Sequence, residues 1–253
     1  MEATNKIALV TGSSRGLGKN EAIALAKNGN DVIITYNSRK DEADKVVAEI
    51  EGLGRKAAAL QLNTAEAKTF ESFKAALSET LQQVWGTDKF NFLINNAGID
   101  WAAPFAQTTE EQLDALYNIH FKGVFLLTQT LLPVIADGGR IVNTSTGLAR
   151  FSTPGYAAYA SMKGAIETLT KYMAKELGSR GITVNAVAPG IIETDFTAAA
   201  REHPGLVEFL SSQTALGRIG QPDDIGGVVA FLCSDAARWI TAQRIEASGG
   251  MFL

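Results

Sequence analysis

The chain has 253 residues, of which 46% are hydrophobic and 20% charged, a composition typical of a globular protein that buries a substantial core. Its formal net charge of −4 argues against a nucleic-acid-binding surface or a polybasic membrane-binding segment. Its single cysteine, Cys233, excludes an intramolecular disulfide framework and is typical of a reducing compartment.

The first apolar stretch of the chain is residues 7–10, which Thr11-Gly12 ends. It is too short for the core of a signal peptide or for a membrane span. We therefore expect a cytoplasmic protein.

Apolar runs of strand length alternate with longer segments of helical pattern along the chain. Strands are predicted at residues 6–11, 32–36, 56–62, 92–95, 140–144, 182–187 and 244–247. Helices are predicted at residues 16–28, 41–53, 65–85, 109–136, 155–179 and 222–232. Strands that are apolar on both faces and separated by helices form a parallel sheet covered on both sides, and right-handed crossovers make it doubly wound. The pattern predicts one α/β domain with a seven-stranded sheet and helices on both faces.

Three glycines, Gly12, Gly16 and Gly18, lie in the run TGSSRGLG, between the first predicted strand and the first predicted helix. Glycine permits a tight turn and close approach of the backbone to a pyrophosphate, and the helix N-terminus adds unpaired N–H groups and a partial positive charge. The run therefore suits the phosphates of a dinucleotide. A glycine-rich turn without a ligand would look the same, so the pattern alone is weak.

Tyr159 and Lys163 are the first and last residues of the run YASMK, which lies in a predicted helix. Residues at i and i+4 lie on one helix face, so the phenol and the ammonium point the same way. A free phenol has a pKa of about 10, and a nearby ammonium favours the phenolate. Tyr159 could then donate a proton to a carbonyl or remove one from an alcohol. Taken alone, such a pair is more often an ordinary surface or packing feature.

The order of these motifs resembles that of the short-chain dehydrogenase/reductase superfamily, over about residues 5–252. The resemblance adds the run NNAG at residues 95–98 and Pro189-Gly190 after the sixth strand to the two motifs above. It is nearest to the branch that contains 3-oxoacyl-ACP reductases and glucose dehydrogenases. It implies a single Rossmann-type domain over residues 1–253, with a substrate loop at about 191–216. The implied activity is that of an oxidoreductase interconverting a carbonyl and a secondary alcohol by hydride transfer.

The resemblance implies a nicotinamide cofactor, and the end of the second strand indicates which one. A carboxylate there would bind a ribose 2′-hydroxyl and repel a 2′-phosphate. Tyr36 occupies that position, and no acid follows until Asp41. Arg15 and Arg39 would suit a 2′-phosphate, although both could equally be solvated surface charges. We therefore expect NADP(H) rather than NAD(H).

The resemblance also implies the remaining contacts to the dinucleotide. Asn63 stands where the family usually has an aspartate that contacts adenine, and its amide oxygen could accept the same hydrogen bond. The backbone N–H of Ile192 is implied to lie near the nicotinamide carboxamide. The implied cofactor-binding residues are Gly12, Ser14, Arg15, Gly16, Leu17, Gly18, Tyr36, Asn37, Ser38, Arg39, Asn63, Thr64, Asn96, Ala97, Gly98, Tyr159, Lys163, Pro189, Gly190, Ile192 and Thr194.

The implied catalytic residues are Thr146, Tyr159, Lys163 and His120. Thr146 stands where the family normally has a serine that hydrogen-bonds the substrate oxygen, and Ser145 is the alternative donor, one residue out of register. Lys163 is implied to hold the ribose and to lower the pKa of the tyrosine.

His120 stands where the family has an asparagine that fixes a helix kink and a water linking the lysine to solvent. Asn118 cannot simply substitute, because two helical positions turn a side chain by about 200°. His120 has both a donor and an acceptor. It could hold that water or relay the proton itself, or it could simply pack.

Two other functions stay open. An NAD-dependent alcohol or sugar dehydrogenase would have the same fold, and a dinucleotide-binding sensor with little turnover would fit the departure at His120. No metal site is expected, because two histidines and one cysteine, widely spaced, do not form a ligand cluster.

The expected partners are a small carbonyl or alcohol substrate and further copies of this chain, with neither nucleic acid nor membrane. The resemblance implies a homotetramer, and the apolar tail 251–253 would be costly to leave exposed. Five aromatic residues indicate an apolar pocket, although each could equally belong to the core or an interface. They are Trp101, Phe151, Tyr156, Phe196 and Phe209.

Overall fold

The protein is described by a computed structural model that covers residues 6–253, apart from the side chains of residues 199 and 200. Within that range, seven parallel strands form one sheet in the order β3-β2-β1-β4-β5-β6-β7. The strands are β1 (Ile7–Val10), β2 (Asp31–Tyr36), β3 (Ala57–Gln61), β4 (Phe90–Asn95), β5 (Ile135–Thr144), β6 (Thr183–Pro189) and β7 (Arg244–Ala247). The predicted doubly wound α/β fold is confirmed. Residues 1–5 of the predicted domain lie outside the described residues.

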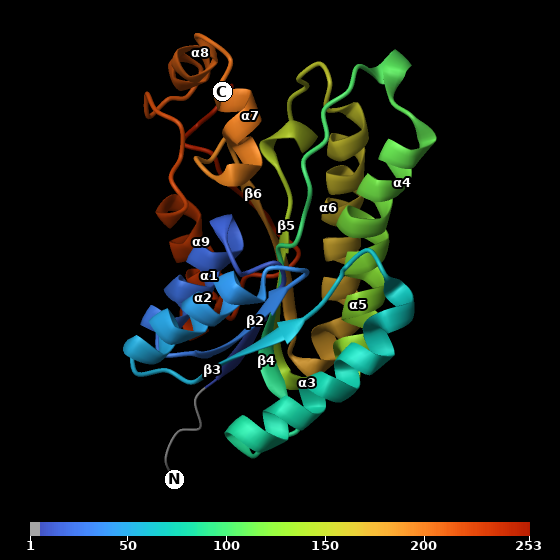
Figure 1. The fold of residues 1–253 in the computed structure, drawn as a ribbon, viewed down its shortest axis with the longest axis vertical. Coiled ribbons are helices and arrows are strands. Elements are labelled where there is room, and N and C mark those ends of the chain that lie inside the picture. Colours follow the sequence, from blue (N-terminus) through green and yellow to red (C-terminus); the bar gives the residue numbers. More distant parts are fainter. Residues whose placement is uncertain (1–5) are drawn as a thin grey trace.

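Helices cover both faces of the sheet (Figure 1). One face carries α1 (Gly16–Lys27), α2 (Lys40–Gly52) and α9 (Asp223–Cys233). The other carries α3 (Phe70–Trp85), α4 (Glu110–Tyr117), α5 (Val124–Leu131) and α6 (Ala157–Leu177). The short helices α7 (Ala198–Arg201) and α8 (Leu206–Ser212) lie at the end of the molecule that holds the C-terminus. Single 3₁₀ turns occur at Ala67–Thr69, Phe105–Gln107, Leu132–Val134, Gly147–Ala149, Gly178–Arg180, Asp195–Thr197 and Asp235–Ala237.

The alternation of side chains along each strand builds two cores, one on each face of the sheet. In β1, Ala8 and Val10 belong to the core under α1, α2 and α9, whereas Ile7 and Leu9 belong to the core under α3, α5 and α6. All four are almost completely buried. Burial of both faces explains why this strand is an unbroken apolar run in the sequence. Within the described part of the chain, no helix is long and apolar enough to cross a membrane.

The prediction of one continuous helix over 109–136 is wrong. A π-helical turn, Asn118–Gly123, separates α4 from α5, and β5 already begins at Ile135. Gly123 permits this turn to pack against the loop after β3, because a Cβ atom there would collide with the carbonyl oxygens of Thr64 and Asn118. Such π turns occur frequently at functional sites.

Candidate active site

The loops after β1, β4, β5 and β6 meet at one edge of the sheet, because the carboxyl ends of parallel strands share an edge. The predicted glycine turn and Thr146 lie on these loops, while the Asn-Asn-Ala-Gly run and Pro189-Gly190 begin at the last residues of β4 and β6. The sheet therefore brings together motifs that are far apart in the sequence.

The glycine turn has the backbone conformation that its residues predict. Gly12 and Gly16 have φ values of +64° and +57°, in the region that favours glycine. A Cβ atom on Gly12 would approach the Ala97 Cα to 2.9 Å, whereas one on Gly16 would meet only the Thr194 Cβ, at 4.0 Å. Gly12 thus permits close packing against the loop after β4, and Gly16 leaves open space at the turn.

Within the described residues, no side chain caps the first turn of α1, so its N–H groups are open to an anion. Its N-cap residue, Arg15, makes no capping hydrogen bond with its side chain, and no acidic residue lies in the first turn. Unpaired N–H groups at a helix N-terminus are suited to phosphate. The open space at Gly16 and these N–H groups fit the pyrophosphate of a dinucleotide.

Two hydroxyl residues that the sequence reading did not single out brace this turn. The Thr11 hydroxyl accepts hydrogen bonds from the backbone N–H groups of Asn96 (2.9 Å) and Ala97 (3.0 Å). Ser13 donates to the Val10 carbonyl (2.7 Å) and accepts from the Thr35 N–H (3.1 Å). The Asn-Asn-Ala-Gly run therefore supports the glycine turn through hydrogen bonds between segments that are far apart in the sequence.

The arginines predicted to select the cofactor are both at the surface, and each already has an acidic neighbour. Arg39 forms ion pairs with Glu42 (2.7 Å) and Asp41 (3.6 Å), while Arg15 lies 3.7 Å from Asp195. The predicted adenine contact Asn63 uses its amide oxygen to accept from the Ala65 N–H (3.0 Å). The ion pairs of Arg15 and Arg39 would have to break before either arginine could bind a phosphate.

Tyr159, Thr146 and Lys163 lie together and are almost completely buried. The Thr146 side chain lies beside the Tyr159 phenol, where it favours the ionised form of the phenol. Lys163 donates to the Thr144 carbonyl (2.7 Å), and its Nζ lies 5.8 Å from the centre of the Tyr159 ring. The structure thus brings these three predicted catalytic side chains together, and the fourth, His120, also lies beside Tyr159.

Burial sets the protonation of both groups in the Tyr159–Lys163 pair. It raises the pKa of Tyr159 well above its ordinary value; the negative charge of Asp100 adds to that rise, and the neighbouring Thr146 side chain opposes it. Burial lowers the pKa of Lys163 to about 7, against the attraction of Glu21. In the free protein, therefore, Tyr159 is a protonated acid near neutral pH, while Lys163 is close to its titration midpoint.

Ser145, the alternative hydroxyl donor, has a different partner. Its side chain is 1% exposed and donates to Glu167 Oε1 at 2.6 Å. Thr146 begins the 3₁₀ turn Gly147–Ala149, accepting from the Leu148 N–H (3.3 Å), and its side chain reaches Tyr159. The geometry favours Thr146 over Ser145 as the hydroxyl at the reacting centre.

His120 lies in the π-helical turn and packs against Tyr159. Its ring is perpendicular to that of Tyr159, with centroids 5.1 Å apart, and its Nε2 lies 2.8 Å from the Ile99 carbonyl oxygen. Its Nδ1 is buried without a hydrogen-bond partner among the described residues. Burial, assisted by the charge of Lys163, lowers the pKa of His120 to about 3, so the ring is neutral near pH 7.

The segment after β6, predicted to lie beside the nicotinamide, is held by its own hydroxyl groups. Thr197 donates to the Ile192 carbonyl (2.6 Å), and Thr194 begins the same short turn. Phe196 lies near the site, with its ring 6.2 Å from that of Tyr159.

A cavity of about 680 Å³ lies between the segments that follow β4 and β5. Of the five aromatic residues predicted to line a pocket, Tyr156 lines this cavity. Phe151 and Phe209 instead contact the ring of Phe252 in the C-terminal tail. The other walls of the cavity are mostly small and apolar: Ala102, Ala103, Pro104, Leu148 and Ala160 are among them. Across the described part of the chain, no group of His, Cys, Asp or Glu side chains is arranged to hold a metal ion.

Glu21 is a buried acid that the sequence reading missed. It lies on α1, is 0% exposed, and neither carboxyl oxygen has a hydrogen-bond partner within residues 6–253. Burial raises its pKa to about 8, although the charge of Lys163 acts in the opposite direction. No local pattern marks this residue, because its burial depends on the packing of α1 against α9 and the sheet.

We expect Glu21→Gln to change how stability depends on pH. Between the ordinary pKa of 4.5 and the folded value of about 8, the folded protein keeps a proton that the unfolded chain releases. The free energy of unfolding of the wild type should therefore fall with rising pH across this window, by at most about 1.4 kcal/mol per pH unit. The glutamine variant should lack this component in denaturant titrations. Glu51→Gln, at an exposed site, should follow the wild type; identical profiles for all three proteins would contradict the expectation.

The fold, the glycine turn and the Tyr159–Lys163 pair at one sheet edge define a Rossmann-type oxidoreductase. Residues 12–252 match the profile of a family described as "Enoyl-(Acyl carrier protein) reductase". The chain belongs to this family, the short-chain dehydrogenases/reductases, and resembles its 3-oxoacyl-ACP-reductase branch.

Named relatives and solved structures agree with this assignment. The chain is 40% identical to the 3-oxoacyl-[acyl-carrier-protein] reductase FabG of Staphylococcus aureus, covering 98% of both chains. It is 38% identical to the corresponding reductase of Synechocystis, covering 99% of this chain and 98% of that one. Its structure is similar to that of the promiscuous reductase LugOII, which catalyses a keto-reduction, with a TM-score of 0.92, 40% identity and coverage of 99% and 98%. It is equally similar to the angucycline C-6 ketoreductase LanV with bound NADP, with a TM-score of 0.92, 37% identity and coverage of 98% and 95%.

Proposed function

We propose that this protein reduces a ketone to a secondary alcohol with NADPH, and that Tyr159 donates the proton. The buried Tyr159 phenol, with the Thr146 hydroxyl beside it and Lys163 one helical turn further on, carries the proposal. Similarity to 3-oxoacyl reductases and ketoreductases supports it. The NADP in the structure of LanV supports the choice of cofactor.

Each side chain has a separate role in this reaction. The Thr146 hydroxyl hydrogen-bonds the substrate oxygen, and Tyr159, kept protonated by burial, transfers its proton to that oxygen. The Lys163 ammonium, fixed by the Thr144 carbonyl, stabilises the phenolate that remains. The bound dinucleotide supplies the hydride to the carbonyl carbon.

The glycine turn and the two arginines would hold the cofactor. Backbone N–H groups at the start of α1 would bind the pyrophosphate, and Lys163 the nicotinamide ribose. Arg15 and Arg39 would bind the 2′-phosphate by exchanging carboxylate partners for phosphate oxygens. On the nicotinamide side, we propose Pro189, Gly190, Ile192 and Thr194 as the contacts.

Replacing Arg39 with alanine should weaken selection for the phosphorylated cofactor. A charged hydrogen bond to phosphate contributes about 1.5–3 kcal/mol, so KM for NADPH should rise by about tenfold or more while that for NADH stays nearly constant. Steady-state kinetics with both cofactors measures this. Lys40→Ala is the control, because Lys40 is the neighbouring exposed cation and pairs with Asp44. Equal changes for the two cofactors would show that Arg39 does not contact the 2′-phosphate.

We propose that His120 keeps the proton path to Lys163 open by holding a water at Nδ1, its buried and unpartnered ring nitrogen. His120→Ala should then lower kcat and alter the pH–rate profile, whereas His120→Asn, the residue usual in the family, should retain most activity with a shifted profile. Both are read from kcat between pH 5 and 9. If the alanine variant is fully active and the asparagine variant leaves the profile unchanged, the relay role is wrong.

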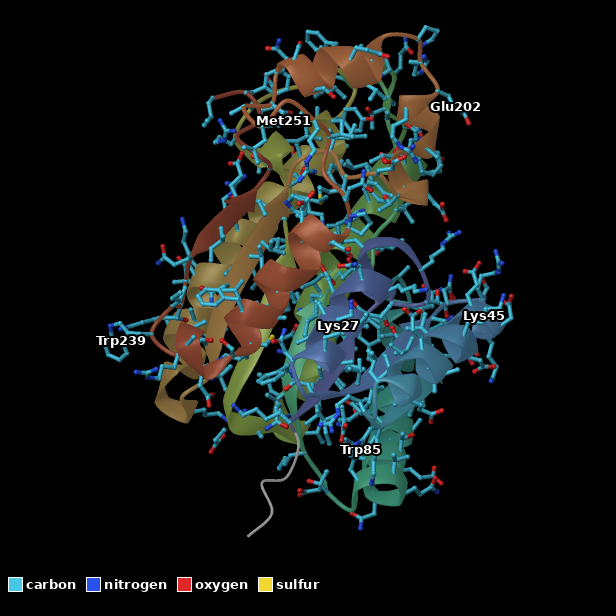
Figure 2. The ribbon with its side chains drawn as sticks, turned by 90° about the vertical axis from the view of Figure 1, so that its left-hand side faces the viewer. Lys27, Lys45, Trp85, Glu202, Trp239 and Met251 are labelled. Carbon is cyan, nitrogen blue, oxygen red and sulfur yellow. The ribbon has the colours of Figure 1, made fainter. Side chains whose placement is uncertain are left out.

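We further propose a cytoplasmic homotetramer. Exposed apolar side chains such as Trp239 (94% exposed) and Leu253 (95%) support burial between copies. Figure 2 shows Trp239 projecting away from the body of the protein. Met251, by contrast, is buried within its own chain, so the apolar tail is only partly available. Light scattering measures the assembly directly.

A carbonyl screen tests the proposed function. Purified protein should oxidise NADPH in the presence of at least some members of a panel of apolar ketones, β-keto thioesters and sugars, with a higher kcat/KM for NADPH than for NADH. A preference for NADH would favour an alcohol or sugar dehydrogenase. Tight NADPH binding without turnover of any panel member would favour a dinucleotide-binding sensor.

A further inference from the structure

Four charged side chains of alternating sign form a chain beside the loop that carries Thr146. Glu167 Oε1 lies 2.5 Å from Arg244 Nε, and Arg244 Nη1 lies 2.9 Å from Glu246 Oε2. Arg150 completes the chain with two hydrogen bonds of 2.7 Å to the Glu246 carboxylate. The residues come from α6, β7 and the turn after β5, so the chain links three elements.

One end of this chain holds the loop directly. Arg244 Nη2 donates to the Thr146 carbonyl oxygen at 3.0 Å, and Ser145 donates to Glu167 Oε1 at 2.6 Å. The backbone of Thr146 and the side chain of the residue before it are therefore tied to the same Arg244–Glu167 pair. The Thr146 side chain, which lies beside the Tyr159 phenol, belongs to the residue that these contacts hold.

The geometry requires an arginine. Its guanidinium reaches three acceptors at once, Glu167, Glu246 and the Thr146 carbonyl, through three different nitrogens. The Arg244 and Glu167 side chains are only 21% and 19% exposed, so solvent screens their attraction less than it does for a surface pair. A lysine at this position would keep the charge but not the planar arrangement of donors.

We propose that Arg244, paired with Glu167, is a positioning residue that fixes the Thr146 hydroxyl against Tyr159. The role of Thr146 in this inference rests on the proposed carbonyl reduction. Arg244 acts only through the loop. Its loss should leave cofactor binding intact and lower the rate at which bound substrate reacts.

The test combines Arg244→Met with a matched control. Arg180→Met removes an arginine with similar contacts, to Asp137 and the carbonyls of Leu132 and Ile135, none of which belongs to the site. Displacement of a reacting group by about 1 Å can cost about 10²-fold in rate. Arg244→Met should therefore lower kcat by about ten- to a hundredfold with the Kd for NADPH unchanged, and Arg244→Lys should recover only a small part. Arg180→Met should keep the wild-type kcat.

A double-mutant cycle separates positioning from a general structural role. On a Thr146→Ala background, Arg244→Met should cause little further loss, because the group that it positions is already absent. A full additional loss on that background, or an equal loss in Arg180→Met, would overturn the proposal.

Hydrogen exchange of the free protein gives a readout that needs no substrate. The amides of Leu148 and Ala149 donate to Thr146, so exchange in a peptide spanning residues 145–151 should accelerate in Arg244→Met and not in Arg180→Met. Glu167→Gln, a milder change, should show the same effect at smaller amplitude if Arg244→Met folds poorly. Unchanged exchange in both Arg244→Met and Glu167→Gln would overturn the proposal. A wild type that reduces no carbonyl would instead overturn the proposed function, while this measurement would still test the Arg244–Glu167 contact.

Discussion

Tyr159→Phe should lower the kcat for carbonyl reduction by about 10²- to 10⁴-fold, the range that general acid catalysis contributes. Phenylalanine fills the same buried space but cannot donate a proton, and Thr146 would be left without its phenol partner. Because the ring remains, the fold and NADPH affinity should change little. Steady-state kinetics together with a cofactor titration by fluorescence distinguishes a loss of chemistry from a loss of binding.

Tyr172→Phe is the matched control for this experiment. Tyr172 lies on the same helix, α6, but is 65% exposed and far from the reacting groups along the helix axis. Its replacement should leave kcat at the wild-type value. If Tyr159→Phe reduces ketones as fast as this control, Tyr159 is not the acid and the mechanism fails.

Lys163→Met should lower kcat by about 10²- to 10³-fold, the usual cost of removing one group that stabilises charge in the transition state. Lys163→Met should also remove the pH dependence that the titration of the Lys163 ammonium gives to the wild-type rate. Burial lowers the pKa of Lys163 to about 7, so the ammonium is present below that pH and is lost above it. Tyr159 stays protonated throughout, because its pKa is raised. The kcat/KM for ketone reduction by the wild type should therefore fall as pH rises past about 7.

The methionine variant should show a flat profile over the same range, at a lower rate. Lys171→Met, at an exposed position on α6, should reproduce the wild-type curve. A profile of Lys163→Met that falls in parallel with that of the wild type would assign the pH dependence to another group.

Local sequence rules were sufficient to predict that the seven strands exist, although not where β5 begins, and to predict the backbone of the cofactor turn. Strand β1 is buried on both faces, so its apolar run is unbroken, and Gly12 and Gly16 adopt the positive φ angles for which glycine is suited. The i, i+4 spacing likewise placed Tyr159 and Lys163 on one helical face, and both are buried together.

Features that depend on distant partners could not be read in this way. The π-helical turn around His120 depends on packing against the loop that contains Thr64, more than fifty residues earlier. The ion pair between Arg39 and Glu42 is local. The sequence, however, does not show whether the Arg39 guanidinium pairs with a carboxylate of the chain or with a phosphate of the cofactor. The burial of Glu21 and the Arg244–Glu167 pair arise only when helices and strands that are far apart in the sequence pack together.

The position of β1 between β2 and β4 has a consequence for synthesis on the ribosome. A nascent chain ending before residue 90 can pair β1 with β2 but leaves the other edge of β1 bare, because its second neighbour has not been made. That edge is apolar on both faces, and unpaired apolar edges in partly folded chains are prone to aggregate. Until β4 emerges, the growing polypeptide therefore presents a surface suited to chaperones, and the glycine turn cannot acquire its support from Asn96.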